Sequence, residues 1–190
     1  MNLLILGPQG SGKGTQAQRI AAEYALEHIA TGDMLRQAIA AGTELGQRVK
    51  PILEAGDLVP DELMIELIRE RLEGLAGGFV LDGFPRTIGQ AQALDGMLRE
   101  VERTPTAVLL FEVPEDVCVA RLLKRAAEEN RSDDTPEVIR TRLEHYHRET
   151  KPLVEYYRAQ GRLIPIPGDR PVDQVFASIQ DALEQTAVRG

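Results

Sequence analysis

Cysteine is almost missing from this sequence of 190 residues, in which Cys118 is the only one. A single thiol can form neither an intrachain disulfide nor a zinc site built from several cysteines. Cys118 also stands between Val117 and Val119, and this apolar neighbourhood favours a small core residue over a nucleophile. We therefore do not expect cysteine to catalyse a reaction or to crosslink the chain.

Basic residues are in the minority, because 22 lysines and arginines face 30 aspartates and glutamates, a formal net charge of −8 at pH 7. Proteins that coat nucleic acids or bind anionic membranes usually need broad basic surfaces, so both classes are disfavoured. A small anionic ligand, held by a local cluster of arginines, remains compatible with this charge.

Long apolar runs are missing as well. No segment is long enough to span a bilayer, and the apolar run at residues 3–6 is too short for a signal-peptide core and lacks a basic lead. We therefore expect a cytoplasmic protein. Residues 1–190 fit a single domain with a substantial apolar interior.

The most informative stretch is residues 2–15, an apolar strand followed by a loop with the sequence Gly-Pro-Gln-Gly-Ser-Gly-Lys-Gly-Thr. Its spacing matches the P-loop pattern, in which glycines let backbone N–H groups converge on phosphate oxygens. A helix that starts near Lys13 would point its N-terminus at the same anion. Lys13 would add positive charge to the β- and γ-phosphates.

One position of this loop departs from the general pattern. A serine or threonine usually follows the lysine directly and contacts Mg²⁺, whereas here Gly14 intervenes and the hydroxyl belongs to Thr15. The loop is therefore not that of a generic GTPase or motor protein. The alternative, a glycine-rich turn that binds nothing, is disfavoured because the loop lies between a strand and a helix.

Further apolar segments read as strands, and helical segments alternate with them. These strands span residues 27–30, 79–82, 106–113 and 163–166. The alternation predicts an α/β fold with a parallel sheet of about five strands and helices on both faces. Two short helices, one capped by Thr31 and the other at about 44–54, predict a small insert. Arg36 in this insert reads, from the residues alone, as a surface charge.

Asp82 stands at the tip of an apolar strand, and Arg86 follows four residues later. An acid at this place beside a P-loop is the arrangement that holds Mg²⁺ or its waters, although Asp82 could also cap the turn. Arg86 is a possible phosphate clamp, which favours the functional interpretation of both residues.

Arg121 and Arg125 stand four apart on a predicted helix, with Lys124 beside them. Like charges at this spacing repel one another, which suggests an anionic partner, and a solvated basic face is the competing interpretation. His145 and His147 are two apart, so they diverge on a helix. We expect both to face solvent rather than to bind a metal.

Five segments together resemble the adenylate kinase family of nucleoside monophosphate kinases, and the resemblance covers essentially the whole chain. They are Gly-Lys-Gly-Thr at 12–15, Thr-Gly-Asp-Met-Leu-Arg at 31–36, Gly-Asp-Leu-Val-Pro at 56–60, Asp-Gly-Phe-Pro-Arg-Thr at 82–87, and Arg-Ser-Asp-Asp at 131–134 with Arg142 downstream. Gly14 is the family's own form of the loop. Five motifs in the family's order are highly specific.

The resemblance implies a reversible reaction in which MgATP and AMP give two ADP. The ATP site that it implies comprises Gly10, Ser11, Gly12, Lys13, Gly14, Thr15, Arg121, Arg125 and the backbone near Arg170. The AMP site comprises Thr31, Arg36, Asp57, Leu58, Val59, Gly83, Phe84, Pro85, Arg86, Gln90, Arg131 and Arg142. Residues 30–59 would form an AMP-binding insert, and residues 126–136 a lid.

Phosphoryl transfer between nucleotides needs in-line positioning and dense positive charge rather than covalent help. The implied catalytic cations are Lys13, Arg86, Arg121, Arg125, Arg131 and Arg142. Mg²⁺ would lie near Asp82 and Thr15. Because water would hydrolyse ATP, the insert and the lid are expected to close over the substrates.

The lid is very short and has no cysteine, so we predict no structural zinc. Short lids also occur in relatives that phosphorylate UMP or CMP, and these acceptors are the alternative, although Thr87 and Gln90 favour AMP. A nucleotide-binding regulatory module is a further alternative, disfavoured by Gly14 and by the missing guanine signature Asn-Lys-x-Asp. We expect small-molecule substrates only, no nucleic acid or membrane, and a monomer.

Overall fold

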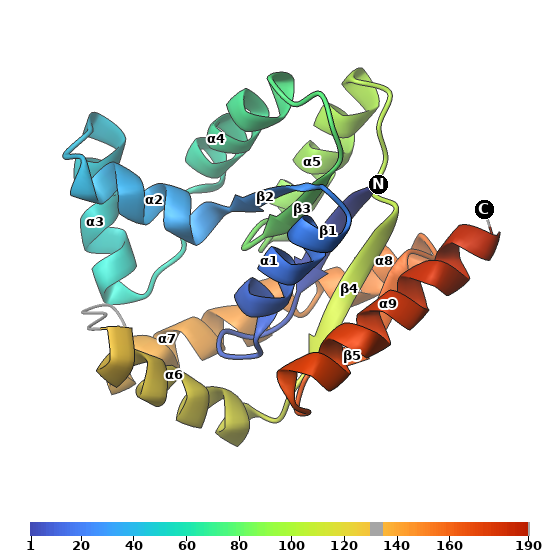
Figure 1. Ribbon diagram of the computed structural model, residues 1–190. Helices are drawn as coiled ribbons and strands as arrows, with labels where there is room; N and C mark the ends of the chain where they lie inside the picture. The colour runs from blue at the N-terminus through green and yellow to red at the C-terminus, as the bar shows by residue number, and fades with distance from the viewer. Residues whose placement is uncertain (130–134, 190) are drawn as a thin grey trace.

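The computed structural model describes residues 1–129 and 135–189. Within these ranges, five parallel strands form one sheet in the order β2-β3-β1-β4-β5, with β1 at its centre (Figure 1). The strands are β1 (Asn2–Leu6), β2 (Glu27–Ala30), β3 (Phe79–Asp82), β4 (Ala107–Glu112) and β5 (Leu163–Pro167). The predicted α/β fold with a parallel sheet of about five strands is confirmed.

Helices connect the strands, and none of those described is long and apolar enough to cross a membrane. They are α1 (Lys13–Glu23), α2 (Thr31–Ala40), α3 (Glu44–Ala55), α4 (Asp61–Glu73), α5 (Ile88–Glu100), α6 (Glu115–Glu129), α7 (Pro136–His145), α8 (Leu153–Ala159) and α9 (Val172–Arg189). A short π-helical turn, Tyr146–Thr150, joins α7 to α8 just before Pro152, where the sequence predicts a bend.

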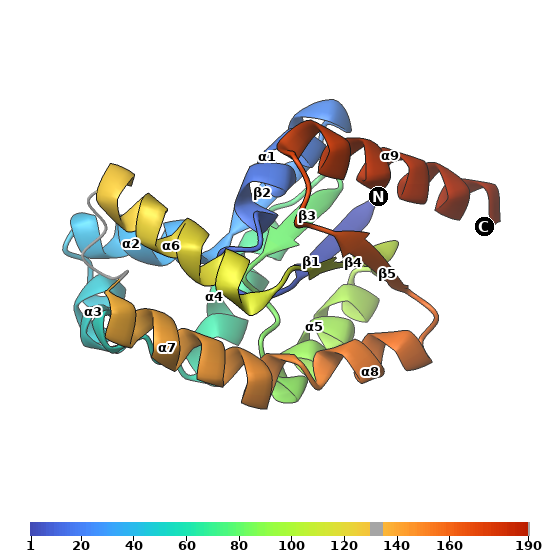
Figure 2. The ribbon, with the colours of Figure 1, turned by 90° about the horizontal axis from the view of Figure 1, so that it is seen from below.

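The two faces of the sheet are covered by different helices (Figure 2). Leu4 and Leu6 of β1 belong to a buried cluster with side chains of α4, α5 and α8. Leu3 and Ile5, which point to the opposite face, pack with side chains of α1 and α9. Burial on both faces explains why the strands read as continuous apolar runs rather than as alternating patterns.

The register of the strands brings their carboxyl ends together. Asp82 at the end of β3 lies opposite Ile5 of β1 on one side and Ala30 of β2 on the other. The loop after β1 and the first residue of α2, Thr31, therefore meet Asp82 at one edge of the sheet. Ligands of open parallel sheets bind outside this edge.

Helices α2 and α3, which occupy the place of the predicted insert, lie beyond this edge of the sheet and cross at Gly46. A Cβ placed on Gly46 would lie 2.1 Å from the carbonyl oxygen of Ala38 and 2.6 Å from the backbone nitrogen of Ile39. The side chain of Thr43 caps α3 by accepting a hydrogen bond from the backbone N–H of Gly46. Glycine is therefore required at this crossing because backbone atoms occupy the place of a side chain.

Replacing Gly46 by alanine is expected to force α2 and α3 apart and to lower the free energy of unfolding by about 1–3 kcal/mol. Thermal unfolding measures the loss, and hydrogen exchange of the α2 amides should rise more than that of the β1 amides. Gly96→Ala in α5 is the matched control, because no heavy atom lies within 4 Å of its added Cβ. Alanine there should be neutral or stabilising by up to about 1 kcal/mol. Equal destabilisation by both variants would contradict the packing argument.

Candidate active site

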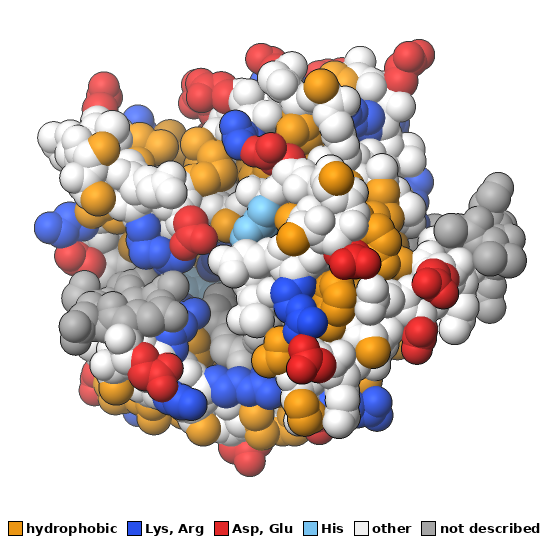
Figure 3. Space-filling model, viewed as in Figure 1, with side chains coloured by type: hydrophobic (Ala, Val, Ile, Leu, Met, Phe, Trp, Pro, Cys, Tyr) orange, Lys and Arg blue, Asp and Glu red, His pale blue; other side chains and the backbone are white. Residues whose placement is uncertain are grey.

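A pocket of about 510 Å³ opens at the carboxyl edge of the sheet. Its walls come from the β1–α1 loop, the start of α2, the end of α3, the β3–α5 loop, and helices α6 and α7. Figure 3 shows this face hollowed between the α2–α3 insert and α6, with Lys and Arg side chains at the rim. An acidic chain therefore concentrates positive charge at one place, which suits an anionic ligand.

The β1–α1 loop folds around the amine of Lys13. Nζ of Lys13 donates to the carbonyl oxygens of Pro8 at 2.6 Å and of Gly7 at 2.8 Å, and lies 3.4 Å from Oγ of Ser11. Gly12 precedes α1 with a φ of 90°, a conformation that favours glycine. The helix therefore begins at Lys13, as the sequence predicts, and its N-terminus faces the pocket.

Helix α6 packs tightly against this loop. A Cβ on Gly10 would lie 2.4 Å from the carbonyl oxygen of Cys118, whose side chain is fully buried, as predicted for a core residue. From the same helix, Nη1 of Arg121 donates to the carbonyl oxygen of Gly168 at 3.0 Å and reaches that of Gly10 at 3.5 Å. Arg121 thus joins the loop to the turn between β5 and α9.

The amine of Lys13 has a lowered pKa. Burial lowers its pKa from 10.5 to about 8, since the charged amine loses hydration; the nearby Asp82 carboxylate opposes this shift, and Arg86 adds to it. A phosphate group at the loop would supply the negative charge that the buried amine needs.

The β3–α5 loop carries Arg86 into the centre of the pocket. Nε of Arg86 donates to the carbonyl oxygen of Gly83 at 2.8 Å, and the buried hydroxyl of Thr150 donates to the carbonyl oxygen of Arg86 at 2.9 Å. Burial lowers the pKa of Arg86; Asp82 raises it, while Arg142 and Arg36 lower it further. The hydrogen bonds with Gly83 and Thr150 fix the loop and leave the guanidinium end of Arg86 directed into the pocket.

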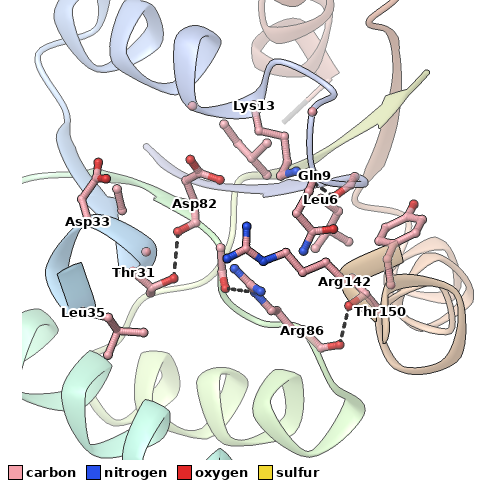
Figure 4. Close-up of a pocket in the computed structure, with 18 of the residues that line it drawn as sticks. Leu6, Gln9, Lys13, Thr31, Asp33, Leu35, Asp82, Arg86, Arg142 and Thr150 are labelled. Carbon is pink, nitrogen blue, oxygen red and sulfur yellow. Dashed lines mark hydrogen bonds between the residues drawn. The ribbon is translucent and has the colours of Figure 1, made fainter. Parts of the chain in front are cut away.

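Arg86 and Arg142 lie side by side in the pocket below Lys13, with their guanidinium groups next to one another, as Figure 4 shows. Arg125 also lines the pocket, from α6. These cations come from three separate helices or loops. Neighbouring cations repel one another in a partly buried pocket, so a polyanionic ligand that binds beside them would be strongly attracted.

The wall on the α2–α3 side contains several of the predicted AMP residues. Thr31 is buried, and its hydroxyl donates a hydrogen bond to the carbonyl oxygen of Asp82 at 3.3 Å. The prediction that Thr31 caps α2 is wrong, because Thr31 is the first residue of the helix and its side chain does not cap it. Arg36 lines the pocket, its side chain is 37% exposed, and it pairs with Asp33 at 2.6 Å, so it is a surface charge that lies at the wall of the pocket. The remaining predicted residues that line this wall are Asp57, Leu58, Val59, Gly83, Pro85 and Gln90.

A few residues that were predicted for the site or for its basic cluster do not line this pocket. Phe84, joined to Pro85 by a cis peptide bond, is 1% exposed and packs in the core. Arg170 is exposed on the turn before α9, and Lys124 lies exposed beside Glu128, at 3.6 Å, rather than in the cluster. Arg131 lies outside the described residues.

The histidine prediction is wrong for His145. Its side chain is 17% exposed, and its Nε2 lies 3.0 Å from Oδ1 of Asp57, which links α7 to the end of the insert. Nδ1 of the same ring accepts a hydrogen bond from Arg148 at 2.9 Å. His147 is half exposed and pairs with Glu115 at 2.8 Å. Spacing along a helix predicts the divergence of the two rings but not these distant partners.

Two further site residues have no signal in the sequence. Thr150 supports Arg86 from a π-helical turn 64 positions away, and Asp61 contacts Gln90 and Thr87 from the start of α4. An aspartate after a proline reads as an ordinary first-turn acid of a helix. Only the packing of α4 against α5 reveals its partners.

A parallel α/β sheet whose first strand leads into a glycine-rich loop around a lysine, with arginines facing that loop, defines a P-loop nucleotide-binding protein. The family model for adenylate kinase matches residues 5–162. An adenylate kinase of Thermus thermophilus is 51% identical over 181 residues, which are 95% of this chain and 96% of the relative. The adenylate kinases of Caulobacter vibrioides (strain NA1000) and Maricaulis maris are each 49% identical, over 98% and 97% of this chain and 99% and 100% of their own lengths. The chain belongs to the adenylate kinase family.

Proposed function

We propose that this chain transfers the terminal phosphoryl group of ATP reversibly to AMP, giving two ADP, in the pocket described above. Its membership of the adenylate kinase family makes it an enzyme, an ATP:AMP phosphotransferase. The observation that carries the location is the convergence of Lys13, Arg86 and Arg142, which come from distant segments and line one pocket.

We assign the ATP phosphates to residues 10–15 of the loop. Lys13 would exchange its carbonyl partners, Gly7 and Pro8, for the β- and γ-phosphates, and Arg121 and Arg125 would flank the nucleotide. The backbone near Arg170 stays the predicted contact of the adenine ring.

We assign AMP to the wall formed by the insert and the β3–α5 loop. Arg36 and Arg86 would bind its phosphate, and Gln90 would contact its base. Arg142, and Arg131 from the lid, would reach the phosphates from the opposite side. This arrangement puts acceptor and donor phosphates on the two sides of Arg86, as in-line transfer requires.

Mg²⁺ would be bound near Asp82 and Thr15. A Cβ added to Gly14 would lie 3.5 Å from Oδ2 of Asp82, which places this carboxylate beside the loop, and the exposed Thr15 lines the same pocket. Mg²⁺ prefers oxygen ligands and usually combines one or two carboxylates with substrate phosphates and water, so these residues fit it. When bound, the ion neutralises negative charge on the phosphates.

Residues 30–59 and 126–136 would close over the two nucleotides and keep water from the reacting phosphate. His145 would couple these parts, since it joins α7 to Asp57 at the end of the insert. The lack of structural zinc, the monomeric state and the cytoplasmic location stay predictions of the sequence.

A coupled assay of ADP formation from MgATP, with AMP, CMP, UMP and GMP in parallel, tests the function. We expect ADP to form only when a monophosphate is present and AMP to be strongly preferred. A preference for CMP or UMP would overturn the acceptor and keep the chemistry. ADP formation that is independent of any monophosphate would contradict the proposal altogether.

The lowered pKa of Lys13 predicts a pH dependence of ATP binding. Because burial lowers this pKa to about 8 and the phosphates would raise it again, binding takes up a proton above pH 8. The affinity should therefore be constant below pH 7 and fall by up to about tenfold per pH unit above pH 8. Calorimetric titration with a non-hydrolysable ATP analogue at pH 8.5, in buffers of different ionisation enthalpy, measures the uptake.

Lys13→Arg is the control for this measurement, since a guanidinium stays charged throughout this range. The variant should bind the analogue without proton uptake at pH 8.5, whatever its affinity. Equal uptake by the variant and the wild type would assign the proton to another group.

A further inference from the structure

Asp61, the first residue of α4, accepts hydrogen bonds from the side chain that caps α5 and from one side chain within α5. Its Oδ2 accepts a hydrogen bond from the hydroxyl of Thr87 at 2.9 Å, and its Oδ1 accepts one from Nε2 of Gln90 at 2.8 Å. Thr87 in turn caps α5 by accepting from the backbone N–H of Gln90 at 3.2 Å. Asp61 is therefore tied to both the start of α5 and the side chain that lines the pocket.

The carboxamide of Gln90 is also held at its other end. Oε1 of Gln90 accepts a hydrogen bond from the backbone N–H of Arg86 at 2.7 Å, and the residue is only 2% exposed. A carboxylate only accepts hydrogen bonds and a backbone N–H only donates them. The carboxylate of Asp61 therefore requires the NH2 group of the Gln90 amide, and the backbone N–H of Arg86 requires its oxygen. A single orientation of the amide satisfies both.

This orientation decides which pattern of hydrogen bonds Gln90 offers to a base. The two contacts use one Nε2 hydrogen and one Oε1 lone pair, and a carboxamide has a second of each. An adenine edge, with an amino group that donates beside a ring nitrogen that accepts, is complementary to this pair. A hypoxanthine or guanine edge has the opposite pattern, a carbonyl oxygen beside a ring N–H, and would require the reversed amide.

We propose that Asp61 is a positioning residue that sets the base selectivity of the acceptor site by fixing the orientation of the Gln90 amide. This inference rests on the proposed function, in which the base of AMP lies at Gln90. Asp61 contacts Gln90 rather than the nucleotide, so its effect should appear in the binding and choice of the base and not in the transfer step.

The test compares Asp61→Ala with the wild type in the coupled assay, using AMP and IMP as acceptors. The KM for AMP should rise about tenfold, and the ratio of kcat/KM for AMP to that for IMP should fall about tenfold. The KM for ATP, and kcat at saturating AMP, should change by less than about threefold. Glu62→Ala is the matched control, because Glu62 is an exposed acid of the same first helical turn.

Two further variants separate positioning from general damage. In a Gln90→Ala background, Asp61→Ala should change neither the KM for AMP nor the ratio of kcat/KM for AMP to that for IMP any further, because the amide on which it acts is gone. Asp61→Asn keeps the shape of the side chain but can present either its oxygen or its NH2 group to Gln90. Discrimination between AMP and IMP should therefore fall by a smaller factor, about threefold. Asp61→Asn also serves as the test if Asp61→Ala fails to fold.

Unchanged discrimination in Asp61→Asn and Asp61→Ala would overturn the proposal. A uniform loss of activity with both acceptors, or the same loss in the Gln90→Ala background, would also overturn it, because a structural role alone predicts these results. A wild-type enzyme that does not use AMP would instead contradict the proposed function, so the two failures are distinct.

Discussion

Replacing Lys13 by methionine is expected to lower kcat/KM for MgATP by about a thousandfold or more. The amine lies within the loop and would reach the β- and γ-phosphates, where negative charge is densest during the transfer. Methionine has a similar length but no charge, so the loop would keep its shape and lose its cation. Steady-state kinetics at saturating AMP measures the effect.

The fold is not expected to suffer from this change. Because the pKa of folded Lys13, about 8, lies below its ordinary value of 10.5, the charged amine costs folding free energy at neutral pH, and the cost disappears only above pH 10.5. Methionine removes this cost and also removes the hydrogen bonds to Gly7 and Pro8, so the two effects oppose one another and the Tm of Lys13→Met at pH 7 should stay close to that of the wild type. Lys124→Met is the control, since Lys124 is exposed on α6, and it should keep full activity. A variant of Lys13 that stays active would remove this residue from the mechanism.

Replacing Arg86 by lysine is expected to lower kcat by about 100- to 1,000-fold although the positive charge is kept. The guanidinium donates from Nε to Gly83 and presents its remaining donors to the pocket, a fork that an ammonium group does not reproduce. Arg86 lies between the assigned donor and acceptor sites, so both the alignment and the charge of the moving phosphoryl group depend on it.

The KM values distinguish this role from a defect in the binding of one substrate. We expect kcat to fall with either acceptor and the KM for AMP to rise by a smaller factor, because AMP also contacts other residues of its wall. Arg69→Lys is the control, since Arg69 is exposed on α4 and pairs with Glu100 away from the pocket. A change in KM alone, with normal kcat, would make Arg86 a simple binding residue.

The sequence alone determined where several strands and helices lie and that the fold belongs to the α/β class. The strands at 27–30 and 79–82 were predicted with their observed bounds, and the helix after the loop was predicted with its observed start at Lys13. Each depends on neighbours along the chain: a short apolar run, a glycine that permits a left-handed backbone, or a break at a turn. Motifs such as residues 10–15 and 82–86 also carry their chemistry locally, and for this reason they indicated a nucleotide site.

Only the tertiary structure decided what several polar side chains contact. Thr31 was expected to cap its own helix, but it donates to Asp82 of a neighbouring strand, 51 positions away. His145 was expected in solvent, but it meets Asp57, and Asp61 meets Gln90. A side chain chooses its partner by distance in space, and that distance is set by how the helices pack on the sheet. No periodicity or spacing along the chain contains this information.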